Sequence, residues 1–151
     1  MLRPGPGLSS RMILAVLLLC STLGISFVEG KATMEQMAKT GELMRSVCIG
    51  KTKVSEDLVN GLGESKFPDV KELKCYVSCI MEMMQAMKKS KLNYDALMKQ
   101  IDTIMPDELA EPMRNAVTIC KNSADGIKNG CEAAYALAQC ISKNNPKFIV
   151  P

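Results

Sequence analysis

Six cysteines are the residues of this chain whose type and spacing could do chemistry. They are Cys48, Cys75, Cys79, Cys120, Cys131 and Cys140, in the pattern C-x26-C-x3-C-x40-C-x10-C-x8-C. Cysteines in this number either hold a metal or form disulfides. Zinc sites use close pairs such as C-x2-C together with histidine, and this sequence contains neither. A redox-active C-x-x-C is also missing. We therefore expect structural disulfides, and no metal or other cofactor.

The amino-terminal 30 residues have the order of a secretory signal. Arg3 and Arg11 precede the apolar run Met12–Leu19. Small residues follow this run, as expected for cleavage after Gly30. Cleavage after Gly24 or Ala32 is an alternative. The apolar run is shorter than the roughly 20 residues that a membrane span needs. Removal of the signal takes Cys20 with it and leaves an even set of cysteines, which is typical of exported, disulfide-stapled proteins. We expect a secreted, extracellular protein without membrane insertion.

Residues 31–151 have the size of one domain. They carry 17 basic and 15 acidic residues, and lysines outnumber arginines 15 to 2. The lysines are scattered along the sequence, whereas a nucleic-acid interface needs clustered charge and usually arginine. We expect a solvated surface and no nucleic-acid partner.

The elements that carry the cysteines all have helical periodicity. Helices are expected over 33–50, 55–63, 70–88, 93–105, 112–126 and 130–141. Thr33 and Gln36 fit a capping box at the first start, and Gly50 is the expected stop. Pro112 is placed in the first turn of its helix, because a proline inside a helix costs about 3 kcal/mol. No segment alternates as a strand does. The sequence predicts a single all-α domain of about six helices.

Cys75 and Cys79 lie four residues apart on one expected helix, so both side chains leave from the same face. Two cysteines placed in this way are expected to reach two different neighbouring helices. The residues alone leave 15 possible pairings of six cysteines open.

The complete cysteine spacing resembles that of the insect odorant-binding proteins, in the six-cysteine form of the pheromone-binding and general odorant-binding family. The likeness covers residues 31–151 in length, cysteine order and expected helices. It implies a six-helix, disulfide-stapled shell around an apolar cavity. It also implies a disulfide pairing of Cys48 with Cys79, Cys75 with Cys131, and Cys120 with Cys140.

The resemblance further implies a carrier that takes small hydrophobic odorants or pheromones through aqueous lymph to a receptor in a sensory-neuron membrane. A homodimer is compatible with it. In several members the carboxyl-terminal tail folds over or into the cavity, and the apolar tail here contains Phe148, Ile149 and Val150. The chain departs from many members in having no tryptophan and no histidine. Histidine-driven release at low pH is therefore excluded, and an acid response would depend on carboxylates.

Methionine is the most distinctive candidate for the wall of such a cavity. Ten of the twelve methionines follow the signal, and their unbranched, polarizable side chains adapt to irregular apolar shapes. The alternative is that they only fill a core. The expected ligand-binding residues are Met44, Ile80, Met81, Met83, Met84, Met87, Leu92, Ile104, Ile127, Phe148 and Val150.

Two other classes of function compete with carriage. The absence of histidine rules out Ser-His, Cys-His and His-metal catalysis. A paired-carboxylate site remains as the alternative, but the acidic residues are spread over the expected helix surfaces, so we expect no enzyme. A secreted helical signalling or toxin-like protein would have a filled core and an exposed recognition patch. Stabilisation by an apolar ligand separates the two, because only a carrier gains stability from it.

Overall fold

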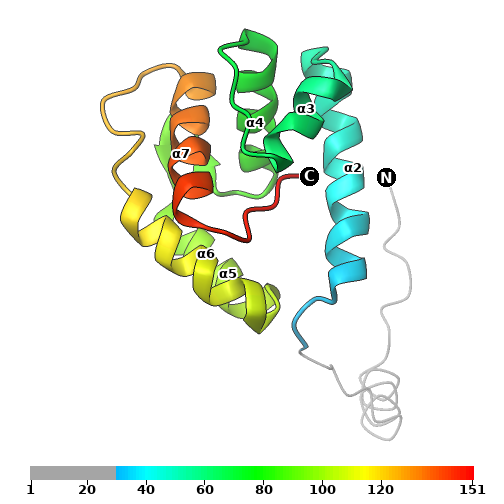
Figure 1. Cartoon of the computed structure of the whole chain (residues 1–151). Helices are drawn as coiled ribbons and strands as arrows, with labels where there is room; N and C mark the ends of the chain where they lie inside the picture. Colours follow the sequence, from blue (N-terminus) through cyan, green and yellow to red (C-terminus); the bar gives the residue numbers. More distant parts are fainter. Residues whose placement is uncertain (1–29) are drawn as a thin grey trace, which may run out of the picture.

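The computed structural model describes residues 30–151, which form six helices and one short hairpin (Figure 1). The expected signal lies outside the described residues. In chain order the elements are α2 (Met34–Thr52), α3 (Glu56–Gly63), α4 (Lys71–Met83), β1 (Met87–Lys88), β2 (Lys91–Leu92), α5 (Tyr94–Ile104), α6 (Asp107–Cys120) and α7 (Gly130–Asn144). The expected all-α class with six helices is confirmed. Within residues 30–151, every helix is too short or too polar to cross a bilayer.

Helix α2 begins where its local sequence predicts and ends later than expected. The Thr33 side chain accepts from the Gln36 backbone N–H at 3.2 Å, and the Gln36 side chain accepts from the Thr33 N–H at 2.8 Å. The expected stop at Gly50 is wrong, because the helix continues to Thr52 and ends at Lys53, whose φ is 61°. Glycine only weakens a helix interior, so it does not by itself end one.

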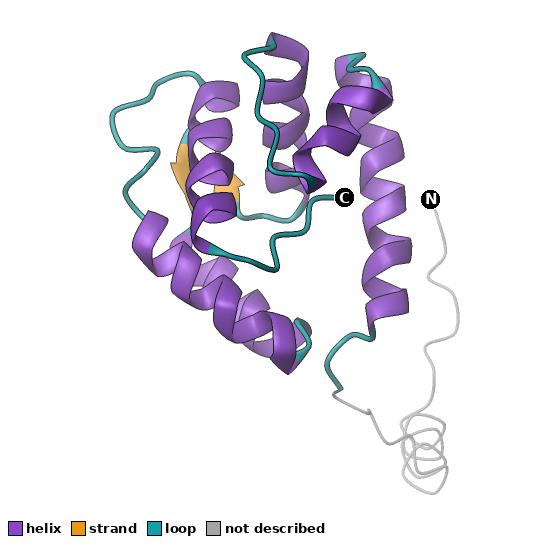
Figure 2. Ribbon diagram, in the orientation of Figure 1, coloured by secondary structure: helices purple, strands orange, loops and turns teal. Residues whose placement is uncertain are grey.

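Helix α4 is shorter than expected and is followed by a hairpin that the periodicity did not predict. The helix ends at Met83, and Gln85 turns the chain with a φ of 55°. Met87 and Lys88 then pair antiparallel with Leu92 and Lys91 (Figure 2). Met87 is buried in this strand (3 % exposed), so burial of the apolar residue does not require the helix to continue.

Helix α6 starts at Asp107 and contains Pro112, which corrects the expected start at that proline. Pro112 has no N–H to donate to the carbonyl of Glu108, one helical turn earlier. The Lys147 ammonium, from the carboxyl-terminal tail, donates to this carbonyl instead, at 3.1 Å. The helix also ends at Cys120 rather than near Gly126, and residues 121–126 form turns.

Three disulfides link four of the helices in one covalent series. Cys48–Cys79 joins α2 to α4, Cys75–Cys131 joins α4 to α7, and Cys120–Cys140 joins α6 to α7. This is the pairing that the resemblance implied, and the two cysteines of α4 reach two different helices as expected. Helices α4 and α7 also pack most extensively on each other and form the centre of the molecule. Leu73 and Tyr76 of α4 and Leu137 of α7 are fully buried there.

Candidate ligand-binding site

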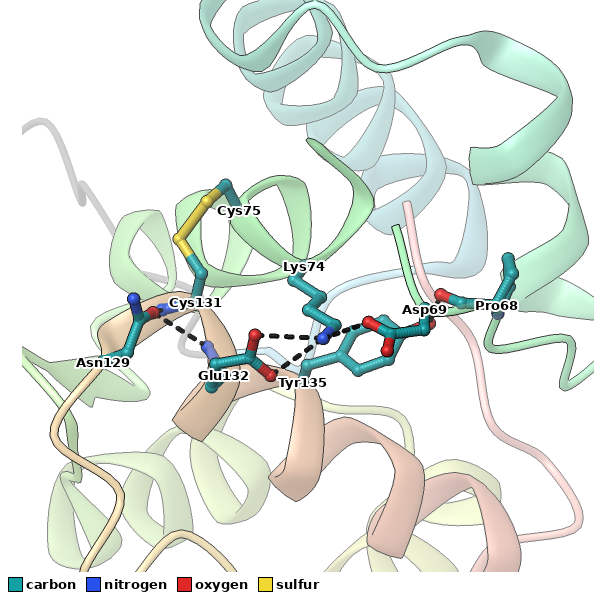
Figure 3. Close-up of polar contacts among 8 residues, drawn as sticks. All are labelled: Pro68, Asp69, Lys74, Cys75, Asn129, Cys131, Glu132 and Tyr135. Atoms are coloured by element: carbon teal, nitrogen blue, oxygen red, sulfur yellow. Dashed lines mark hydrogen bonds and ion pairs between the residues drawn. A yellow bond between two sulfur atoms is a disulfide. The ribbon is translucent and has the colours of Figure 1, made fainter. Parts of the chain in front are cut away.

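Helices α4 and α7 are joined along one seam by ion pairs and a disulfide (Figure 3). Both helices contribute buried side chains to the apolar interior. The ammonium of Lys74, on α4, lies 2.9 Å from both carboxylate oxygens of Glu132, on α7. It also pairs with Asp69, which precedes α4. These contacts raise the pKa of Lys74, the hydrogen bond with Asp69 most of all. The neighbouring Cys75–Cys131 disulfide crosslinks the same two helices, so the seam is held by charge and by a covalent bond.

Tyr135 of α7 closes the other end of this seam. Its hydroxyl donates to the backbone oxygen of Pro68 at 2.6 Å (Figure 3). Its ring packs edge-on against Phe67, with 5.4 Å between the ring centroids. Burial raises the pKa of Tyr135 to about 12. The phenol is therefore neutral at physiological pH, and its one proton is already committed to the protein backbone.

Nine of the eleven expected ligand-binding residues lie in the apolar interior. Ile80 and Met87 are buried, at 3 % exposure each. The other seven are half-buried and pack against the same core; they are Met44, Met81, Met84, Leu92, Ile127, Phe148 and Val150. Residues from α2, α4, the hairpin, the α6–α7 loop and the tail thus converge on one cluster.

The remaining two expected residues, Met83 and Ile104, lie at the surface. Each is the last residue of its helix, and their exposures are 44 % and 52 %. The Met83 sulfur lies 3.5 Å from the Cys48 sulfur, at the outer edge of the Cys48–Cys79 bridge. The backbone oxygen of Ile104 accepts from the Ala32 N–H at 2.8 Å, which holds the segment before α2 against the end of α5.

The tail after α7 runs back into the molecule between α7 and α2 (Figure 1). Asn145 is buried, and its side-chain oxygen accepts from the Lys147 N–H at 2.9 Å, which turns the chain inward. The Phe148 ring then lies 6.2 Å from the Phe67 ring, between centroids. Half-buried Phe148 and Val150 place the tail among the nine interior residues.

The tail ends against α2 and α4. The hydroxyl of Tyr76, on α4, donates a hydrogen bond to the backbone oxygen of Pro151. On α2, Gly41 leaves room for the Pro151 ring, because a Cβ at Gly41 would lie 3.3 Å from the Pro151 Cβ. Burial raises the pKa of Tyr76 to about 12, so this phenol is also a neutral donor whose proton is in use.

Two of the hollows on the described surface have no methionine in their walls. The larger, of about 490 Å³, lies beside α4 and is lined by charged residues of both signs and by Cys75, Cys79 and Cys131. The smaller, of about 290 Å³, lies over the Lys74 seam; Ile127 is the one expected site residue that it contains. The larger hollow therefore contains none of the expected site residues, and the smaller one meets the apolar interior at Ile127 and Phe67.

Several half-buried residues of the same interior were not among the expected site residues. Four of them are large and apolar and could contact a ligand: Phe67, Met98, Met105 and Met113. Phe67 lies in an extended segment before α4, so no helical periodicity marks it as inward-facing. Met98 and Met105 fit the apolar periodicity of the helix expected over 93–105, and Met113 fits that of the next helix. This spacing marked all three as inward-facing and could have identified them as site residues.

Comparison with known proteins agrees with this architecture. The PBP/GOBP family model matches residues 30–144. General odorant-binding protein 72 of Anopheles gambiae is 44 % identical over 119 residues, which cover 79 % of this chain and 98 % of the relative. Among solved structures, odorant-binding protein 5 of Apis mellifera superposes with a TM-score of 0.75 at 32 % identity, covering 81 % of this chain and 100 % of that one.

A second solved structure has the same fold. Odorant-binding protein 4 of the predator Chrysopa pallens superposes with a TM-score of 0.73 at 37 % identity, covering 79 % of this chain and 98 % of its own. The family match spans all six helices described above, and the three disulfides follow the pairing that the cysteine spacing implied. The chain therefore belongs to the PBP/GOBP family of odorant-binding proteins.

Proposed function

We propose that this protein is an extracellular carrier that binds small hydrophobic volatile molecules among its nine interior residues and delivers them to membrane receptors. The observation that carries the proposal is the convergence of these apolar side chains, from five separate segments, on one cluster. The names of the relatives, odorant-binding proteins of Anopheles gambiae, Apis mellifera and Chrysopa pallens, support the same class of ligand.

Affinity in this site would come from apolar area rather than from hydrogen bonds. The hydroxyls of Tyr76 and Tyr135 both donate to backbone oxygens already. Burial of apolar surface contributes about 25 cal/mol per Å² before the entropic costs of binding. A guest of moderate size would then bind with micromolar affinity, about −8 kcal/mol. We expect weak selection for polar groups and stronger selection for size and shape.

Entry of a guest requires the tail to yield space. Phe148 and Val150 are half-buried against the same cluster as Met84 and Ile127. Flexible methionine side chains can adjust their rotamers around a guest, and the tail can withdraw without breaking a disulfide, since the last cysteine is Cys140. The tail and the guest would therefore compete for the same volume.

Carriage in this proposal proceeds without catalysis. The sequence has no histidine, which removes the general base of the common nucleophilic mechanisms. The acidic side chains with a lowered pKa, Glu64 and Asp107, are exposed and paired with Lys66 and Lys31. Surface ion pairs of this kind are ordinary stabilising contacts.

Displacement of an environment-sensitive apolar dye by a panel of volatiles tests the proposal. Met84→Ala and Met83→Ala form a matched pair, because the two residues are adjacent but Met84 is half-buried against the core whereas Met83 is exposed. We expect Met84→Ala to change dye affinity several-fold and Met83→Ala to leave it unchanged. Equal effects of both variants would overturn the assignment to the interior, and no displacement by any volatile would count against carriage itself.

Thermal unfolding gives an independent measurement. A carrier gains RT ln(1 + [L]/Kd) from a ligand that binds only the folded state. At ligand concentrations 100 times the Kd this amounts to about 2.7 kcal/mol. A helical protein with a filled core, such as a signalling protein, would show no such gain.

A further inference from the structure

The hairpin that interrupts the helices carries three lysines and brings them next to a fourth from a distant loop. Lys88 and Lys91 are directly opposite each other on β1 and β2, and Lys89 lies in the turn between them. The Ser90 hydroxyl donates to the backbone oxygen of Lys128 at 2.6 Å, which places the α6–α7 loop beside this turn (Figure 2). We call Lys88, Lys89, Lys91 and Lys128 the lysine patch.

The lysines of the patch are not paired with acidic side chains in the described part of the chain. All four side chains are exposed, and none forms an ion pair within residues 30–151. The two segments that form it, 87–92 and 127–130, contain no acidic residue. Residues 30–151 as a whole have a net charge of +2, and without these four lysines their net charge is −2. Folding therefore places Lys128 beside the three lysines of the hairpin and gathers four positive charges at one place.

The patch also holds its lysines in unfavourable positions. Directly opposed residues of an antiparallel pair have Cβ atoms about 5 Å apart, and like charges there are destabilising. Lys89 has a φ of 58°, in the left-handed region that glycine adopts without strain. Three other non-glycine residues with positive φ, Lys53, Ser65 and Gln85, follow the ends of helices, whereas Lys89 forms a hairpin turn. A bound anion would offset the repulsion between the lysines.

The side chains around the patch indicate the kind of anion. Met87 is buried and its partner Leu92 is half-buried, so both strands turn their apolar residues inward and none is left to enter a bilayer. The patch has no aromatic residue for stacking on nucleic-acid bases and no arginine. Protein–protein interfaces are depleted of lysine and need an apolar centre. What fits is a chain of closely spaced, hydrated anionic groups.

We infer that the lysine patch binds a sulfated polysaccharide. Lysine ammonium groups act as point charges that need no fixed bidentate geometry, and clusters of basic residues are typical of heparin-binding surfaces. The sulfates of such a chain would lie between Lys88 and Lys91 and continue past the turn to Lys128. This site is separate from the apolar interior and does not depend on the proposed carriage.

Binding to heparin, measured by calorimetry over a range of salt concentrations, tests the inference. The patch variant is Lys88→Gln/Lys91→Gln/Lys128→Gln. The matched control is Lys71→Gln/Lys99→Gln/Lys143→Gln, which removes three exposed lysines outside the patch that also form no ion pair in the described chain. We expect the patch variant to weaken binding by about tenfold and to lower the salt dependence, and the control to change affinity by less than about threefold.

Further variants show whether a loss of binding comes from misfolding, and further ligands identify the chemical group that is bound. Lys88→Arg/Lys91→Arg/Lys128→Arg should retain binding, and Lys89→Gly should raise the melting temperature while it weakens binding. Equal losses in the patch and control variants would overturn the inference, since they would reflect overall charge. Hyaluronan binding as tightly as heparin would overturn the assignment to sulfate. Tighter, patch-dependent binding to phosphatidylserine vesicles would replace it with a lipid surface.

Discussion

The hydroxyl of Tyr76 donates a hydrogen bond to the backbone oxygen of Pro151, 75 residues further along the chain. Tyr76 is fully buried on α4, so the bond draws the tail into the interior rather than along the surface. The hydrogen bond between Tyr76 and Pro151 therefore stabilises the fold, and it also holds the tail in volume that a bound ligand would need.

Tyr76→Phe is expected to loosen the tail. The change removes the donor and leaves the Pro151 oxygen without its partner, which costs about 1–2 kcal/mol in the free energy of unfolding. Urea denaturation measures this loss. Tyr94→Phe is the control, because the Tyr94 hydroxyl lies 3.2 Å from the Thr118 hydroxyl at an exposed site, and its removal should cost less than about 0.5 kcal/mol. Equal losses of unfolding free energy in the two variants would show that the Tyr76–Pro151 hydrogen bond contributes no more to stability than an exposed one.

Alkaline pH is expected to destabilise the protein through its buried phenols. Burial raises the pKa of Tyr76 and of Tyr135 to about 12 each, whereas tyrosine in an unfolded chain titrates near 10. Between these values the unfolded state loses protons that the folded state keeps, so the free energy of unfolding falls as pH rises from about 10 to about 12. Below about pH 10 the contribution is fully present.

The double variant Tyr76→Phe/Tyr135→Phe isolates this effect from lysine titration, which both proteins share. Denaturation at about pH 9 and about pH 11 should show a steeper fall for the wild type than for the variant. Parallel curves for the two proteins would rule out a contribution from the phenols.

Two glycines of α2 provide a test of the space that the tail occupies. Alanine in a helix interior is favoured over glycine by about 1 kcal/mol. A Cβ at Gly50 would meet nothing within 4 Å, so Gly50→Ala should raise the free energy of unfolding. A Cβ at Gly41 would lie 3.3 Å from the Pro151 Cβ, so Gly41→Ala should gain less or lose stability. Deletion of Pro151 should restore the gain at Gly41, and an equal gain at both sites in the full chain would contradict the packed tail.

Pro112 and Lys147 should be energetically coupled, although they are distant in the sequence. Lys147→Met removes the ammonium that donates to the Glu108 carbonyl at 3.1 Å, and we expect it to cost about 0.5–1 kcal/mol. In a Pro112→Ala background the alanine N–H can donate to that carbonyl within the helix, so Lys147→Met should then cost almost nothing. A double-mutant cycle measures the difference, and additive effects would argue against this role of Lys147.

Local sequence determined the features that could be predicted here. The capping box of Thr33 and Gln36 forms because its partners are three residues apart. The cysteine spacing led to the correct pairing through the family resemblance, and helical periodicity identified most of the interior. The misplaced start of α6 has the opposite cause, because Glu108 and its partner Lys147 are 39 residues apart. Likewise, the inward position of Phe67 depends on Tyr135 and Phe148, which no local pattern reveals.

The disulfides divide the molecule into parts with different freedom to fluctuate. α2, α4, α7 and α6 are bonded in series, whereas α3, the hairpin and α5 contain no cysteine and lie within the loops that the Cys48–Cys79 and Cys75–Cys131 bridges close. Amide hydrogen exchange should therefore be fastest over residues 54–70 and 84–106 and slowest in the central α4–α7 pair. Transient opening of α3, the hairpin or α5 would expose the interior to solvent while all three disulfides stayed intact.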